Sequence, residues 1–148
     1  MIIARVISGR DPSAIVRAVP TMSMQEGIDL LARHRIGAVP VVEGPGAEDG
    51  PVVGVFSERD AMYCLAREGA AALDRPLAEV MTAPVITITL QTTVLEALSM
   101  MTARRFRHLP VVEDGKMIGL VSMGDLVKHR LDAVEREAEA MRSYIQAT

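Results

Sequence analysis

Residues 107–125, with the sequence RHLPVVEDGKMIGLVSMGD, decide the fold of this chain. The runs at 108–113 and 116–121 are rich in Val, Ile and Leu and are typical of short strands. The Asp-Gly pair at 114–115 predicts a tight turn between them, since both residue types tolerate a positive φ. Ser122-x-x-Asp125 then predicts the start of a helix. The stretch is therefore expected to form a β-hairpin followed by a helix.

The same pattern occurs earlier in the chain. A shift of 70 positions places residues 15–43 on 85–113, and removal of five loop residues then places 51–60 on 116–125. The identical pairs are Glu26/Glu96, Arg35/Arg105, Pro40/Pro110, Val41/Val111, Val42/Val112, Glu43/Glu113, Gly54/Gly119, Ser57/Ser122 and Asp60/Asp125. Two copies of one supersecondary unit explain this pattern.

Each copy is expected to begin with a strand and a helix before the hairpin. In the second copy the β-branched run 85–89 predicts the strand, and Thr93 with Glu96 forms a capping box for a helix that ends near Arg105. The first copy has its capping box at 23–26, and Gly37 is expected as the left-handed stop of its first helix. Its hairpin loop, 44–51, is longer.

These elements predict an α/β fold in which the order β-α-β-β-α occurs twice. A three-stranded unit of this size is marginal alone, so we expect the two copies to pack with pseudo-twofold symmetry. The expected divisions are a lead-in segment at 1–14, repeat 1 at 15–70, a linker with a short helix (76–81) at 71–84, repeat 2 at 85–131 and a C-terminal helix extension at 132–148.

Composition excludes several classes of protein. Hydrophobic residues make up 49% and charged residues 24% of the 148 residues, as in a globular domain. The 16 Lys and Arg against 19 Asp and Glu give a net charge of −3, which argues against nucleic acid as a partner. Cys64 is the single cysteine, so it is expected in the core of a reduced protein. No apolar run approaches the roughly 20 residues of a membrane helix, so we expect no membrane partner and a cytoplasmic location.

This layout resembles the CBS domain pair, named after cystathionine β-synthase. The resemblance is carried by AVPVV at 38–42 and GVFSERD at 54–60, and again by RHLPVV at 107–112 and GLVSMGD at 119–125. It implies a stand-alone regulatory module with tandem CBS repeats that binds an adenosine ligand between them. The family's ligands are AMP, which we expect first, and ATP, ADP, NAD and S-adenosylmethionine.

The residues of the second copy suit a nucleotide. Ser122 and Asp125 lie at a helix start, where the dipole and free amides favour a phosphate. Ser122 can donate to the phosphate, and Asp125 can accept from both ribose hydroxyls. Arg107 and His108 can add phosphate contacts. The resemblance further implies that Thr87 lies near base and ribose, and that backbone groups of Val85 and Ile88 contact the adenine edge.

The first copy offers Ser57 and Asp60 at the equivalent helix start, with Arg59 beside them. It has Arg17 in place of Thr87 and Gly37-Ala38 in place of Arg107-His108. Its phosphate contacts are therefore expected to be poorer, although Arg59 can reach a phosphate in the central cleft. We expect the ligand in the second-copy site, with the first empty or holding the other part of a dinucleotide.

Two alternatives stay open for these motifs. Ser-x-x-Asp is also a capping box variant, so the chain can be a ligand-free dimerisation adaptor. An enzyme is not expected, because no G-x-S-x-G, H-E-x-x-H or Walker sequence occurs and the three His residues lack metal-ligand spacing, which also predicts no bound metal.

The end of the chain carries an apolar stripe. Its members are spaced alternately four and three residues apart, the pattern of a coiled-coil seam. They are Val127, Leu131, Val134, Ala138, Met141 and Ile145. We expect this helix to take part in a homodimer; the alternative is that it packs back on its own globule. The sequence does not name the regulated protein.

Overall fold

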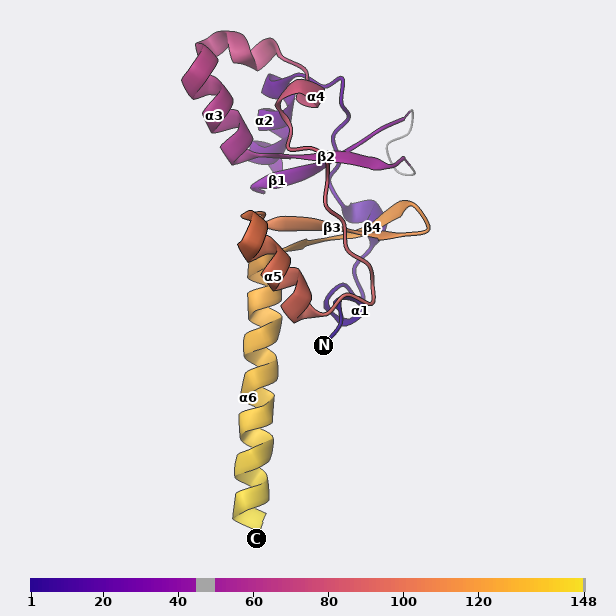
Figure 1. Ribbon diagram of the computed structural model, residues 1–148, viewed down its shortest axis with the longest axis vertical. Coiled ribbons are helices and arrows are strands. Elements are labelled where there is room, and N and C mark those ends of the chain that lie inside the picture. Colours follow the sequence, from indigo (N-terminus) through magenta and orange to yellow (C-terminus); the bar gives the residue numbers. More distant parts are fainter. Residues whose placement is uncertain (45–49, 148) are drawn as a thin grey trace.

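The structure is a computed structural model that describes residues 1–44 and 50–147. It contains two similar halves, one above the other in Figure 1. The first half has α2 (Met24–His34), β1 (Ala38–Val42), β2 (Val52–Ser57) and α3 (Glu58–Glu68). The second half has α5 (Val94–Arg104), β3 (His108–Glu113), β4 (Lys116–Ser122) and α6 (Met123–Ala147). The duplication predicted from the sequence is therefore confirmed.

Shorter elements connect the two halves. They are α1 (Ile3–Val6), η1 (Pro12–Ala14), η2 (Gly69–Asp74) and α4 (Leu77–Val80), of which η1 and η2 are 3₁₀-helices. The short linker helix is confirmed, but Pro76 is its N-cap and not its first residue. The longer loop predicted at 44–51 lies mostly outside the described residues.

The two hairpins match in detail. β1 pairs antiparallel with β2, with a bulge between Val41 and Val42, and β3 pairs antiparallel with β4, with a bulge between Val111 and Val112. The predicted turn is confirmed, because Asp114 and Gly115 have φ of 51° and 79°. The same short-range features of the sequence thus determine the strand pairing and the bulge in both hairpins.

The third strand predicted for each repeat is not formed. The segments before α2 and α5 contribute isolated parallel bridges, Ala18 to Val41 and Ile88 to Val111, so each sheet has two strands. Each of these segments pairs with its neighbouring strand at one residue only, and the linker before Ile88 forms a separate bridge in the first repeat, from Thr82 to Val55.

Helix ends follow the predicted caps with one correction. The capping boxes that begin α2, α3 and α5 are all present. The left-handed residue that ends α2 is Arg35, with φ of 54°, and not Gly37. Ile36 then donates its N–H to Leu31 O at 3.1 Å and packs against the core. The left-handed turn at Arg35 thus brings the partly buried Ile36 onto the core. Arg105, with φ of 59°, is likewise the left-handed residue that ends α5.

Each repeat is completed by a helix from outside its own span. Ile3 and Val6 of α1 lie in the core of the second repeat, and the N–H of Ile3 donates to Thr92 O at 2.8 Å. Leu77 of the linker helix α4 lies in the core of the first repeat, and its N–H donates to Met22 O at 2.8 Å. The lead-in and the linker thus play equivalent parts in opposite halves.

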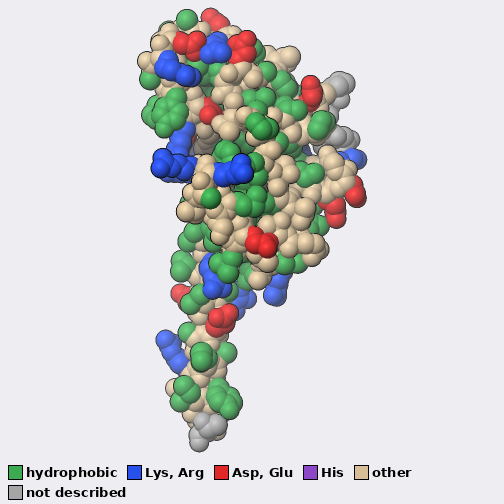
Figure 2. All heavy atoms as spheres, viewed as in Figure 1, with side chains coloured by type: hydrophobic (Ala, Val, Ile, Leu, Met, Phe, Trp, Pro, Cys, Tyr) green, Lys and Arg blue, Asp and Glu red, His purple; other side chains and the backbone are tan. Residues whose placement is uncertain are grey.

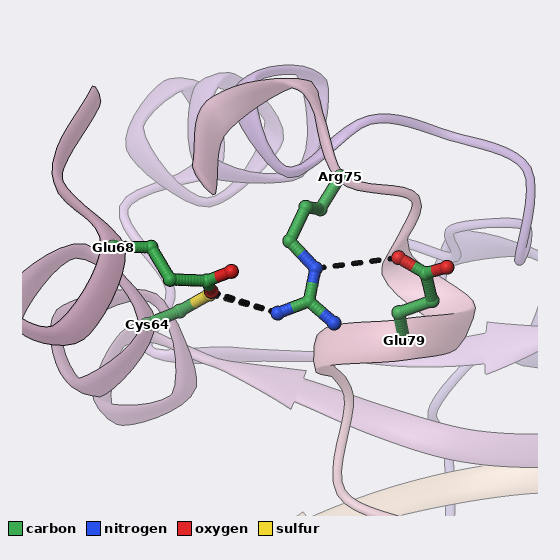
Figure 3. Close-up of polar contacts among 4 residues, drawn as sticks. All are labelled: Cys64, Glu68, Arg75 and Glu79. Atoms are coloured by element: carbon green, nitrogen blue, oxygen red, sulfur yellow. Dashed lines mark hydrogen bonds and ion pairs between the residues drawn. The ribbon is translucent and has the colours of Figure 1, made fainter. Parts of the chain in front are cut away.

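A polar cluster fixes the linker to α3 (Figure 3). The Arg75 guanidinium lies between two carboxylates, 2.7 Å from Glu68 and 3.3 Å from Glu79. The Cys64 thiol donates to the same Glu68 carboxylate at 2.9 Å, and this bond raises the pKa of the thiol. Cys64 is buried, as expected for a core residue, and its thiol is held in the protonated form.

The last helix leaves the globule. α6 contains one fully buried residue, Leu126, near its start, and the rest projects away from both repeats (Figure 1). Within the residues that the structure describes, no helix combines the length and the apolar character needed to cross a membrane.

Candidate functional site

A cavity of about 270 Å³ lies where the two repeats meet. This volume is close to the lower end of the range for small-molecule pockets, ~300–1,000 Å³. Three segments line it: the start of α3 with the adjoining strand ends, the linker, and the turn from α5 into β3. Its lining includes Ser57, Arg59, Asp60, Thr82, Ile86 and Arg107.

The start of α3 supplies the polar end of the cavity. The Asp60 carboxylate accepts hydrogen bonds from the N–H of Ser57 at 2.9 Å and from its hydroxyl at 3.0 Å. Its other oxygen accepts from the Thr82 hydroxyl at 3.0 Å. Ser57 in turn accepts from the N–H of Asp60 at 3.2 Å. The carboxylate is therefore held in one orientation at the positive end of a helix dipole.

Gly54 allows the linker to reach this point. The N–H of Val55 donates to Thr82 O at 3.1 Å, and the N–H of Thr82 donates back to Val55 O at 2.9 Å. A Cβ on Gly54 would lie 2.5 Å from the Met81 sulfur and 3.0 Å from Thr82 O. Glycine at this position is required because the linker backbone passes directly over β2.

The opposite wall comes from the second repeat and the linker. Val85 and Ile86 are half-buried and give it an apolar surface, while Arg105 and Arg107 are exposed at its rim. Figure 2 shows Lys and Arg side chains on the visible face at about the level where the repeats meet. Burial lowers the pKa of His108, which also lines the cavity, so its imidazole is neutral at pH 7.

A model of the CBS domain matches residues 13–67 and 77–132, which together span most of the chain. The chain belongs to the CBS domain family. Its fold is thus the tandem CBS arrangement that the sequence resemblance implied, followed by the long C-terminal helix.

Known CBS proteins resemble the chain along most of its length. The CBS domain-containing protein CBSX3, mitochondrial, of Arabidopsis thaliana is 33% identical over 84% of this chain, which spans 60% of that protein. A CBS-domain containing protein from Agrobacterium tumefaciens has a crystal structure with 37% identity and a TM-score of 0.78, covering 87% of this chain and 92% of that one. A CBS domain protein from Pyrobaculum aerophilum, complexed with AMP, has 25% identity and a TM-score of 0.71, covering 84% and 89%.

The structure gathers six of the ten residues singled out from the sequence around this one cavity. They come from both copies and are Ser57, Arg59, Asp60, Val85, Arg107 and His108. The helix start and Arg59 therefore belong to the first repeat, while Arg107 and His108 belong to the second. The sequence predicts the ligand at the second-copy helix start, with Arg59 able to reach the central cleft. The cavity contains the first-copy helix start instead, beside which Thr82 of the linker bridges Val55.

Thr87, Ile88, Ser122 and Asp125 do not line the cavity. Ile88 is 3% exposed; its N–H donates to Pro110 O at 3.0 Å and its carbonyl accepts from the N–H of Val112 at 2.9 Å. These backbone groups are used within the second repeat and do not face an adenine edge. Thr87 is exposed outside the cavity.

Arg10 covers the helix start of the second repeat. Its guanidinium lies 3.4 Å from the Asp125 carboxylate and 3.4 Å from Leu120 O. Asp125 also accepts from the N–H of Ser122 at 3.0 Å, and Ser122 accepts from the N–H of Asp125 at 3.0 Å. Partial burial raises the pKa of Asp125, but the bonds from Ser122 and the charge of Arg10 outweigh it and lower the pKa.

Sequence reasoning missed several lining residues, including Thr82, Ile86, Tyr63 and Arg105. Arg105 is one of the identical pairs of the repeat, so the alignment carried a signal for it. Thr82 had none, because its contact with Asp60 depends on the path of the linker. Among the described residues, no group of three or more His, Cys, Asp or Glu side chains is placed to hold a metal ion.

Proposed function

We propose that this chain is a regulatory module that binds an adenine nucleotide, AMP foremost, in the cavity between its CBS repeats. The observation that carries the proposal is the convergence on one cavity of a helix N-terminus, an oriented carboxylate and arginine side chains from both repeats. AMP in the related Pyrobaculum aerophilum protein supports this ligand class.

Each part of a mononucleotide has a matching surface. The phosphate is favoured at the α3 N-terminus and beside Arg59 and Arg107, which offer planar bidentate donors. The ribose hydroxyls donate to the Asp60 carboxylate, whose contact with Thr82 is exchanged for them. The base lies against the apolar wall of Val85 and Ile86. The cavity volume favours a mononucleotide over NAD as the occupant.

A regulatory role follows because the lining residues of the cavity come from both repeats. A ligand that contacts α3 of the first repeat and β3 of the second stabilises the arrangement in which both surfaces face it. It shifts the population of this arrangement only by its difference in affinity between the two states. We propose that a partner protein, still to be identified, senses this shift, and that the role is binding and not catalysis.

Calorimetric titration of nucleotide-free protein with AMP, ATP, NAD and S-adenosylmethionine tests the proposal. Removal of a charged acceptor by Asp60→Ala is expected to weaken AMP binding roughly 10- to 100-fold. Asp125→Ala is the matched control, because it removes the equivalent carboxylate outside the cavity and is expected to leave AMP binding unchanged. Circular dichroism verifies that both variants fold.

The ligand-free adaptor is the competing function. The hydrogen bonds between Ser57 and Asp60 favour it, because they form a complete capping box with no ligand present. Absence of heat with all four ligands would support the adaptor and overturn the sensor. Equal losses of AMP binding in Asp60→Ala and Asp125→Ala would overturn the assignment of the ligand to this cavity.

We further propose that the chain forms a homodimer, which sedimentation equilibrium of the full chain tests. The cytoplasmic location stays a prediction from the sequence, and microscopy of the tagged full chain tests it.

A further inference from the structure

The part of α6 that projects from the globule carries an exposed apolar stripe. Val127 is 42% exposed, Leu131 58%, Val134 45% and Met141 68%. Figure 2 shows hydrophobic side chains on the surface of this extension. Spacings of four, three and seven residues place Leu131 at an a position and the other three at d positions of a heptad repeat. Large apolar side chains in such a row are the pattern of an interface.

The globule does not cover this stripe. α6 contacts its own repeat through Leu126, which is fully buried, and three of its residues line a small hollow beside the start of α5: His129, Arg130 and Ala133. At 3.6 residues per turn these contacts lie about a third of a turn from the row of Leu131 and Val134. The face that packs on the globule and the apolar face are therefore different, and a second helix can approach the latter.

We propose that α6 pairs with α6 of a second copy of this chain as a parallel two-stranded coiled coil. In a parallel pair each g position faces the e position five residues later on the other helix. Arg130 then faces Glu135 of the second copy, and Glu137 faces Arg142 of the second copy. Both contacts join opposite charges, and the two-fold symmetry of the pair means that each contact occurs twice.

The antiparallel pair of the same length is disfavoured by the same residues. With Leu131 facing Met141 of the second copy, e positions face e positions and g positions face g positions. Glu135 then faces Glu135, Glu137 faces Glu137, and Lys128 faces Arg142, so charges of like sign are juxtaposed. Antiparallel pairs shifted by a heptad avoid this repulsion but shorten the apolar seam.

This inference deepens the proposed homodimer and is independent of nucleotide binding. It gives the dimer a two-fold axis parallel to α6, with both globules at one end and the two C-termini together at the other. The start of α6 lies close to the cavity, since the N–H of Met123 donates to Arg107 O, but the rest of the helix projects away from both repeats (Figure 1). Loss of the coiled coil along this projecting part is therefore expected to leave AMP binding intact. Failure of the dimer and failure of the nucleotide site are thus measured separately.

Disulfide trapping in the full chain distinguishes the arrangements. In the parallel pair Met141 meets Met141 of the second copy, so Met141→Cys is expected to cross-link almost completely under mild oxidation. In the antiparallel pair the two Met141 positions are about 15 Å apart along the axis, beyond the ~7 Å Cα separation that a disulfide spans. Ser143→Cys, on the outer face, is the matched control, and buried Cys64 is expected to give no dimer in the wild type.

Charge exchange gives a second readout by sedimentation equilibrium. Glu135→Arg is expected to weaken the dimer at least threefold, and the double variant Arg130→Glu with Glu135→Arg is expected to restore it. Val134→Glu is expected to yield monomers with unchanged circular dichroism. A wild type that is monomeric throughout, equal cross-linking of Met141→Cys and Ser143→Cys, or no recovery in the double variant each overturns the proposal.

Discussion

The replacement Leu77→Ala tests whether the linker helix completes the first repeat. Leu77 is fully buried, and its side chain lies so close to Gly27 that a Cβ there would be 3.0 Å away. The change removes about three carbon groups, worth about 2.4 kcal/mol at ~0.8 kcal/mol each. Phe56 is also fully buried and cannot move far into the space, so a cavity contribution adds to this. We expect a loss of about 3–4 kcal/mol, within the range of buried leucine truncations.

Urea denaturation followed by circular dichroism measures this loss. Leu95→Ala is the matched control, because Leu95 is 56% exposed on α5 and its truncation is expected to cost within about 0.5 kcal/mol. A loss below about 1 kcal/mol for Leu77→Ala, or an equal loss for Leu95→Ala, would contradict the assignment of α4 to the core of the first repeat. The same variant is expected to weaken AMP binding, because α4 positions the linker over the cavity.

Three further predictions concern charge and close contact. Burial lowers the pKa of His108, so the unfolded chain binds more protons as pH falls from about 7 to 5; stability therefore falls in that range, and His108→Gln is expected to reduce the slope in denaturation curves. The pKa of Asp125 is also lowered, so its stabilisation is present above about pH 4 and is lost as pH falls through the folded-state value. Asp125→Ala is expected to cost about 1 kcal/mol at pH 7 and progressively less as the pH falls below about 4, as acid-dependent melting would show. Gly54→Ala places a Cβ against Met81 and is expected to lower stability by about 1–3 kcal/mol and to weaken AMP binding, whereas Gly124→Ala, whose Cβ would have its nearest contact at 3.7 Å, is expected to do neither.

Local signals in the sequence predicted the hairpins and the helix starts. The Asp-Gly turn at 114–115 and the capping boxes of α2, α3 and α5 depend on residues within a few positions of one another, so the pattern suffices. The expected strand at 85–89 is reduced to one bridge, from Ile88 to Val111. The β-branched residues favour an extended backbone, but they do not determine how far a neighbouring strand pairs along it.

In the candidate site, too, the sequence predicts local features but not contacts between distant segments. Ser57, Asp60 and Arg107, which were singled out from the sequence, all line one cavity. The alignment of the two copies shows which positions are equivalent, but it does not show which copy each side chain faces. Arg10 illustrates the point: it lies before the repeated segment, had no aligned partner, and yet covers the helix start at Asp125.

The crossed placement of α1 and α4 has a consequence for dissection of this chain. A fragment cut between the repeats would carry the helix that its lost neighbour needs and lack the one that fills its own interior. Two such fragments would each recover the missing core helix only by exchanging helices, as in a domain-swapped pair. In the intact chain the two helices are exchanged within one molecule. Neither half can then fold completely without the other, which disfavours their separation in evolution.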